Sequence, residues 1–196
     1  MSLRFSSLAG SASLFCTLGL SVLSAAPARA FMFDLFPTQP QAREGRPLAS
    51  ASPRETVAYG GPEKPGTIII STEERRLYYV LDGGQALRYG VGVGRPGFEW
   101  SGVRRITNKR EWPDWTPPSQ MIARRPDLPR HMEGGIENPL GARAMYIGGT
   151  LYRIHGSNEP DTIGQAVSSG CIRMTNYDVV DLYDRVKVGT KVVVQR

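Results

Sequence analysis

The chain has 196 residues, with 24 Lys and Arg against 18 Asp and Glu and a formal net charge of +6 at pH 7. This length is sufficient for one domain with a hydrophobic core. The sequence holds no Lys/Arg-rich block and no nucleic-acid-binding motif, so its charge does not indicate a nucleic-acid partner. A modest positive charge is compatible with an anionic polymer such as a cell wall, but it does not specify one.

Residues 1–30 have the three parts of a secretory signal peptide. Arg4 supplies a basic start, residues 8–23 are apolar or small and uncharged, and Ala-Arg-Ala at 28–30 fits the small-residue cleavage rule. The alternative is a retained membrane anchor. It is less favoured because Ser, Gly and Thr dilute the apolar stretch, which is short for a span. We therefore expect an exported, periplasmic, cell-wall-associated protein with no stable membrane span after cleavage.

The segment after the cleavage site predicts a tether. Residues 31–63 hold repeated prolines separated by Gln, Ala, Ser, Gly and Arg. Such a composition does not bury enough apolar surface to fold by itself. Order is expected from about Pro65, which leaves one domain over residues 64–196.

This domain predicts short strands and one clear helix, hence a mainly β fold. Residues 100–112 predict either a strand pair or one long strand with a polar turn near Asn108. Thr175 and Asp178 resemble a capping box and open a predicted helix over residues 175–187, with Gly189 as its C-terminal cap. The other β-rich runs lie at 67–70, 76–81, 85–93 (a hairpin with 76–81 across Gly83-Gly84), 144–154 (two strands around Gly148-Gly149) and 191–194.

Residues 121–142 have no periodicity and contain several Pro and Gly. An irregular segment of this length in a compact domain is usually functional. We expect a lid over a site, because the segment leads directly into the strands before His155. The alternative is a surface excursion.

Cys171 is the candidate reactive group. Cys16 would leave with the signal peptide, so Cys171 would be the single thiol of an exported protein. A lone Cys is often a buried, inert residue. Here the Ser168-Ser169-Gly170 flank predicts a turn shortly before a helix, where backbone N–H groups lower a thiol pKa. Two histidines and one cysteine without clustered spacing make no usual zinc site, so no metal is expected.

The sequence around these residues resembles the L,D-transpeptidase (YkuD-type) catalytic domain over about residues 64–195. The matching stretches are Ile154-His-Gly-Ser-Asn158, Ile163-Gly164, Ser168-x-Gly-Cys-Ile-Arg-Met174, residues 176–183 and residues 138–146. Many members have His where this chain has Ser169. The resemblance implies a β-sandwich-like domain, Cys171 as the nucleophile, His155 as the base, and the Gly156 carbonyl as third member of the triad. It implies no cofactor.

Attack of a thiolate on an amide produces an oxyanion, for which the N–H groups of Gly170 and Cys171 are the natural donors. Arg173 either binds a substrate carboxylate or pairs with an acid of the next helix, such as Asp178. Ser168 either donates to the site or forms the turn. We place Tyr146 and Asn158 with Arg173 and Ser168 as substrate-binding candidates. For Tyr146 the alternative is packing.

The expected activity is that of an exported peptidoglycan L,D-transpeptidase. By resemblance, a tetrapeptide stem acylates Cys171 and releases D-alanine, and the acyl group passes to an amine. The amine belongs either to a second stem, giving a 3→3 cross-link, or to an envelope protein. One alternative is an L,D-carboxypeptidase that uses water as acceptor. Another is a wall-binding module without catalysis.

Overall fold

The structure of the chain is a computed structural model that describes residues 53–196. The predicted signal peptide and most of the predicted tether lie outside the described residues. Within the described part, no helix is long and apolar enough to cross a membrane.

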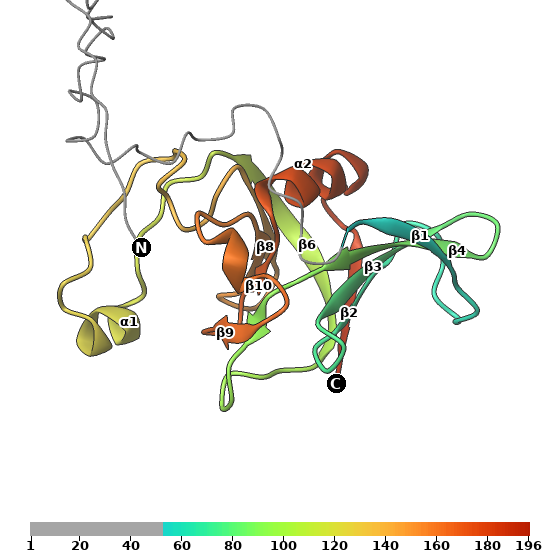
Figure 1. Ribbon diagram of the computed structural model, residues 1–196, viewed down its shortest axis with the longest axis horizontal. Coiled ribbons are helices and arrows are strands. Elements are labelled where there is room, and N and C mark those ends of the chain that lie inside the picture. Colours follow the sequence, from blue (N-terminus) through green and yellow to red (C-terminus); the bar gives the residue numbers. More distant parts are fainter. Residues whose placement is uncertain (1–52) are drawn as a thin grey trace, which may run out of the picture. The chain divides into compact units, whose positions relative to one another are not determined.

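Eleven strands and two α-helices make up the described part of the chain (Figure 1). The strands are β1 (Glu55–Ala58), β2 (Ile68–Ser71), β3 (Arg76–Leu81), β4 (Gln85–Gly90), β5 (Val93–Gly94), β6 (Gly102–Glu111), β7 (Arg143–Ile147), β8 (Arg153–His155), β9 (Ala166–Ser168), β10 (Ile172–Arg173) and β11 (Lys191–Gln195). The helices are α1 (Ser119–Arg124), α2 (Asn176–Arg185) and the 3-10 turn η1 (Pro160–Thr162). Nine strands form one sheet in the order β1-β4-β3-β2-β11-β6-β7-β8-β10, and β5 pairs with β9. The prediction of a mainly β domain is confirmed.

Strand β6 joins the two halves of the sheet. Residues before Ile106 pair with β11, residues from Ile106 onward pair with β7, and the register shifts between Ile106 and Asn108. A bulge of this kind bends and twists a strand, so the two halves enclose a common core. The region 100–112 is therefore one long strand, with an irregularity beside the residue where a turn was expected. The core cluster joins both halves with α2 through Ile68, Ile70, Leu77, Tyr89, Met145, Ile147, Ile154, Ile172, Val179 and Leu182.

Helix α2 begins as predicted and ends earlier than predicted. The Thr175 hydroxyl accepts a hydrogen bond from Asp178 N at 3.1 Å and donates one to the Asp178 carboxylate at 2.9 Å. The helix stops at Arg185, with Val186 as its C-cap, so the predicted end at 187 and the Gly189 cap are wrong. The Lys109 ammonium of β6 donates to the Tyr183 carbonyl at 2.6 Å and so satisfies one of the acceptors that the end of the helix leaves open.

The ordered domain begins before the predicted boundary at residue 64. Strand β1 pairs antiparallel with β4, and Arg54 forms an ion pair with Asp181 of α2 at 2.9 Å. The prediction of a tether to residue 63 is therefore wrong for residues 54–63. The prediction relied on the low apolar content of this segment. An edge strand, however, is held by hydrogen bonds from its neighbour and needs little apolar burial of its own.

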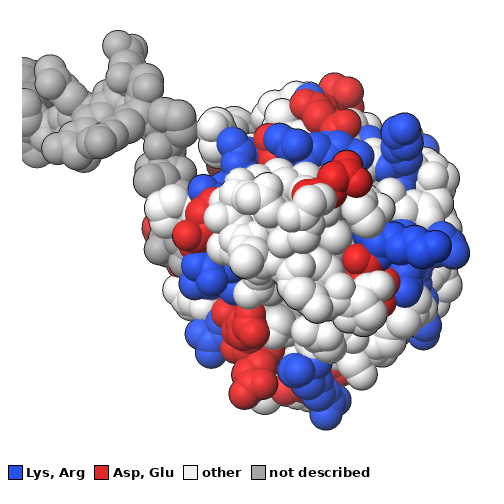
Figure 2. Space-filling model, turned by 90° about the vertical axis from the view of Figure 1, so that its right-hand side faces the viewer, with Lys and Arg blue, Asp and Glu red and all other residues white. Residues whose placement is uncertain are grey.

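Figure 2 shows one face of the molecule, on which Lys and Arg side chains are interspersed with Asp and Glu around an uncharged centre. Opposite charges at such short range largely cancel at a distance. This face therefore presents no extended surface of one sign.

Candidate active site

Two short parallel strands bring the candidate catalytic residues together. Strands β8 and β10 pair so that Ile154 lies opposite Ile172 and His155 lies opposite Arg173. Ile154 and Ile172 point into the core and are fully buried. Because side chains alternate along a strand, the residues on either side of these two isoleucines point to the opposite face. That face carries His155 from β8 and Cys171, which directly precedes β10.

His155 and Cys171 line a cavity of about 730 Å³. One wall of this cavity comes from the irregular segment before β7, including α1. Helix α1 buries none of its own residues in the core. The guanidinium groups of Arg95 and Arg124 lie 4.2 and 5.6 Å from the centroid of the Phe98 ring, and these contacts connect α1 to the loop after β5. The segment 121–142 thus forms a wall of the pocket, as expected for a lid.

The histidine has a fixed tautomer. His155 Nδ1 lies 2.6 Å from the Gly156 carbonyl oxygen, which only accepts hydrogen bonds. Nδ1 therefore carries the proton, and Nε2 keeps its lone pair. Burial lowers the pKa of His155 to about 3; the Gly156 carbonyl opposes this shift, and the charges of Arg173 and Arg153 add to it. The imidazole is neutral at pH 7 and able to accept a proton.

The Cys171 thiol is only partly exposed, and it faces the same cavity. Burial raises the pKa of Cys171, whereas the backbone N–H and guanidinium of Arg153 and the charge of Arg173 act to lower it. With the imidazole also neutral, the resting pair is a thiol and a base rather than an ion pair.

The turn before Cys171 is held by Ser168. Its hydroxyl donates to the Cys171 carbonyl at 2.6 Å and accepts from Gly170 N at 3.1 Å. Ser168 therefore forms the turn, which is the second of the two roles expected for it. In this structure the Gly170 N–H is engaged with Ser168, so its role as an oxyanion donor stays a prediction that would require this contact to be released. Within residues 53–196 the Cys171 N–H has no acceptor, which leaves it free for an oxyanion.

Gly170 is required by its surroundings. It has a φ of 106°, and a Cβ atom at this position would lie 2.3 Å from the Tyr152 ring. Tyr152 stacks on Trp100 at 5.0 Å, and Trp100 Nε1 donates to the Gly170 carbonyl at 2.8 Å. The two aromatic rings therefore fix the turn that presents the thiol.

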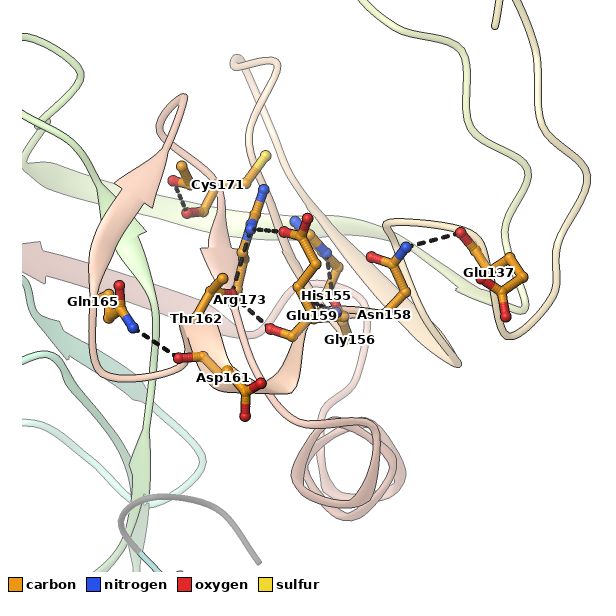
Figure 3. A network of polar contacts seen from close by, with 12 residues as sticks. Glu137, His155, Gly156, Asn158, Glu159, Asp161, Thr162, Gln165, Cys171 and Arg173 are labelled. Carbon is orange, nitrogen blue, oxygen red and sulfur yellow. Dashed lines mark hydrogen bonds and ion pairs between the residues drawn. The ribbon is translucent and has the colours of Figure 1, made fainter. Parts of the chain in front are cut away.

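Arg173 pairs with Glu159, an acid other than the one expected from the sequence. Its guanidinium lies 2.8 Å from the Glu159 carboxylate and 3.4 Å from the Thr162 hydroxyl (Figure 3). Asp178, the acid named as a structural partner, is instead buried and bonded to Thr175. Asp161 points away from His155 in Figure 3. The charge of Arg173 is thus engaged within the protein.

The other two substrate-binding candidates differ in position. Asn158 lines the cavity and donates to the Glu137 carbonyl at 2.9 Å, so it ties the lid segment to the loop after β8. Tyr146 does not line the cavity; its ring lies beneath the Arg153 guanidinium at 5.0 Å. Its placement favours packing over direct contact with a substrate.

Sequence reasoning missed Arg153 and Asn176. Arg153 lines the cavity two residues before His155, so strand alternation from His155 gives it the same face. Asn176 opens α2, and its Oδ1 accepts from Ala142 N at 2.8 Å, which ties the helix to the chain before β7. The contact of Asn176 is between distant segments and leaves no local pattern.

Comparison with known proteins identifies the family. The profile of YkuD, the L,D-transpeptidase catalytic domain, matches residues 65–194. The chain therefore belongs to the YkuD family of L,D-transpeptidases. It is 39% identical over 134 residues to the probable L,D-transpeptidase ErfK/SrfK of Escherichia coli K12, and 37% identical over 134 residues to the probable L,D-transpeptidase YbiS of the same strain. These alignments cover 64% of this chain and 42% and 43% of the relatives, so the chain matches under half the length of each.

Solved structures agree on the fold. An L,D-transpeptidase from Mycobacterium smegmatis superimposes with a TM-score of 0.53 at 20% identity, covering 66% of this chain and 58% of that one. A Brucella melitensis structure is 47% identical with a TM-score of 0.51, covering 76% and 96% of the two chains. The latter is described as a probable carnitine operon oxidoreductase, a different activity from that of the family.

Proposed function

We propose that this protein is an exported enzyme that performs cysteine-dependent L,D-transpeptidation on peptidoglycan stem peptides. The observation that carries the proposal is the placement of Cys171 and His155 on one face of two adjacent strands, inside one cavity. The Gly156 carbonyl holds His155 in the tautomer that a general base requires.

In the first half-reaction, Cys171 Sγ attacks the carbonyl carbon of the third stem residue while its proton passes to His155 Nε2. Because burial disfavours both the free thiolate and the imidazolium, proton transfer is coupled to bond formation. The tetrahedral oxyanion accepts a hydrogen bond from Cys171 N–H. The imidazolium returns its proton to the leaving nitrogen, the C–N bond breaks, and D-alanine departs from a thioester.

In the second half-reaction, an amine attacks the thioester carbon, His155 removes a proton from the amine, and the C–S bond breaks to regenerate the thiol. The amine belongs to a second stem or to an envelope protein. Water in the same place would make the enzyme an L,D-carboxypeptidase. In the third alternative, a wall-binding module, Cys171 would take no part.

Intact-mass measurement tests the proposal. The full chain and a Cys171→Ala variant are incubated with disaccharide-tetrapeptide. A transient acyl adduct on the wild type alone, with free D-alanine and a dimeric muropeptide, is the expected result. D-Alanine with monomeric tripeptide and no dimer would indicate trimming, or a protein acceptor. A folded wild type with a titratable thiol but no adduct and no D-alanine would refute the catalytic proposal and favour the binding module.

A further inference from the structure

Arg153 is the side chain that lies opposite the nucleophile. Continuing the β8–β10 register by one residue from the Ile154–Ile172 pair places Arg153 across from Cys171. Both residues line the cavity. Burial raises the pKa of the Cys171 thiol, and the positive charge of Arg153 acts to lower it.

The charge of Arg153 has no counterion in the described part of the chain. Four other arginines line the cavity. Arg173 pairs with Glu159 at 2.8 Å and Arg125 pairs with Asp127 at 2.6 Å. Arg95 and Arg124 make no ion pair in the described part either, but their guanidinium groups lie against the Phe98 ring, and neither residue is on the strand that faces Cys171. Arg153 makes no ion pair within residues 53–196; its one hydrogen bond to a protein acceptor there is a long contact, 3.4 Å, with the Leu151 carbonyl. Its Nε is buried and makes no hydrogen bond. A buried donor without an acceptor is costly, and a ligand that supplies one recovers that cost.

The position of the guanidinium is fixed in advance. It lies over the Tyr146 ring at 5.0 Å from the centroid, and Tyr146 is the residue opposite Arg153 in the pairing of β7 with β8. Cation–π attraction to the ring restrains the guanidinium, whose N–H groups form a planar fork. A planar fork of this kind matches a carboxylate.

We propose that Arg153 binds the carboxylate that lies next to the scissile amide of the donor, and so selects donors with a free C-terminal carboxylate. The inference rests on the proposed function, because in a tetrapeptide donor this carboxylate belongs to the D-alanine that leaves. In such a donor it is separated from the attacked carbonyl carbon by only the amide nitrogen and one carbon. A group opposite Cys171 is placed to reach it. After acylation the carboxylate departs with D-alanine, and the same guanidinium is free again when the acceptor enters.

The first experiment does not depend on transpeptidation. Iodoacetate and iodoacetamide alkylate the same thiol; in each case a C–S bond forms, the C–I bond breaks, and iodide and the thiol proton leave. They differ in that iodoacetate carries a carboxylate beside the reacting carbon. The rate constants for the Cys171 peptide of the full chain are measured by mass spectrometry for wild type, Arg153→Gln, Arg153→Lys and Arg104→Gln. The last variant removes the same charge from an exposed position on β6, outside the cavity.

The iodoacetate-to-iodoacetamide rate ratio is expected to fall about tenfold or more in Arg153→Gln, as for loss of a charge-assisted hydrogen bond. It falls less in Arg153→Lys, which keeps the charge but not the fork, and is unchanged in Arg104→Gln. An unchanged ratio in Arg153→Gln would overturn the proposal. If both rates fell equally, Arg153 would act on the thiol alone, and the proposal would also be wrong. Should Arg153→Gln fail to fold, Arg153→Lys is used instead. A lower iodoacetate-to-iodoacetamide rate ratio in this variant than in wild type would support the proposal, and an unchanged ratio would overturn it.

The second experiment uses the reaction itself. Tetrapeptide donor and its C-terminal amide are compared by D-alanine or D-alaninamide release. Wild type is expected to favour the acid in kcat/KM, and Arg153→Gln to lose most of this preference through a raised KM for the acid. An equal preference in both proteins would overturn the proposal. If neither donor reacts with any variant but the alkylation ratio still depends on Arg153, the proposed function fails while the carboxylate site stands.

Discussion

Replacing His155 by Gln should flatten the dependence of stability on acid pH. His155 is buried, and its pKa falls from 6.5 to about 3 in the folded protein. Between these values the unfolded chain binds a proton at this residue and the folded chain does not. Relative to its value above about pH 6.5, the free energy of unfolding therefore decreases as the pH falls toward 3. Each pH unit in this window removes about 1.4 kcal/mol from the free energy of unfolding.

Between pH 6.0 and 4.5 this loss amounts to about 2 kcal/mol for the single residue, because the unfolded form is almost fully protonated there. Urea unfolding at pH 7.5, 6.0, 5.25 and 4.5 measures it for wild type, His155→Gln and the control His131→Gln. His131 is exposed, with half of its side chain accessible to solvent. The acidic groups common to all three proteins cancel in the comparison.

The wild type and His131→Gln should lose stability in parallel, and His155→Gln should lose about 2 kcal/mol less over the window. Absolute stabilities at pH 7.5 do not enter the test. Parallel curves for wild type and His155→Gln would show that burial does not keep this imidazole neutral. The coupled proton transfer proposed above would then lose its basis.

Three further predictions concern the turn, the helix start and the thiol. Gly170→Ala should lower the free energy of unfolding by about 1–3 kcal/mol, since it combines a positive φ with a clash against Tyr152; an unchanged melting temperature would contradict this. Asn176→Ala should cost about 1–3 kcal/mol in urea unfolding because the buried Ala142 N–H loses its acceptor, and a loss under 0.5 kcal/mol would mean that water replaces it. Under the proposed mechanism a β-lactam, whose strained amide carbonyl is open to the same thiol attack, should add its mass to the wild type and not to Cys171→Ala; equal adducts on both would exclude Cys171 as the acylated residue.

Local sequence patterns predicted the parts of the fold that depend on neighbouring residues. The hairpin at Gly83-Gly84 formed, with both glycines at positive φ, and the Thr175–Asp178 cap opens α2. Strand β1 was missed because its stability comes from the free edge of β4. Helix α1 was missed because it is short and lies in a Pro-containing segment without an apolar periodicity.

The site was predictable only in part, because its contacts join segments that are distant in the sequence. The residues between His155 and Cys171 form η1 and β9, and no periodicity shows that β8 and β10 pair in parallel. The family resemblance supplied their association. It did not show that Ser168 occupies the Gly170 N–H, or that Glu159 engages Arg173. Each of these depends on the position of a side chain in three dimensions.

The wall formed by α1 and the chain after it has a consequence for how such enzymes diversify. Cys171 and His155 are fixed by strands whose neighbours are buried in the core, whereas α1 buries nothing and is linked to the loop after β5 through the ring of Phe98. Exposed contacts between guanidinium groups and aromatic rings contribute only about 0.5–1 kcal/mol each. Substitutions and insertions in α1 are thus expected to put the fold at little risk. Under the proposed function, changes in this wall would alter substrate preference over evolutionary time without disturbing the strands that hold Cys171 and His155.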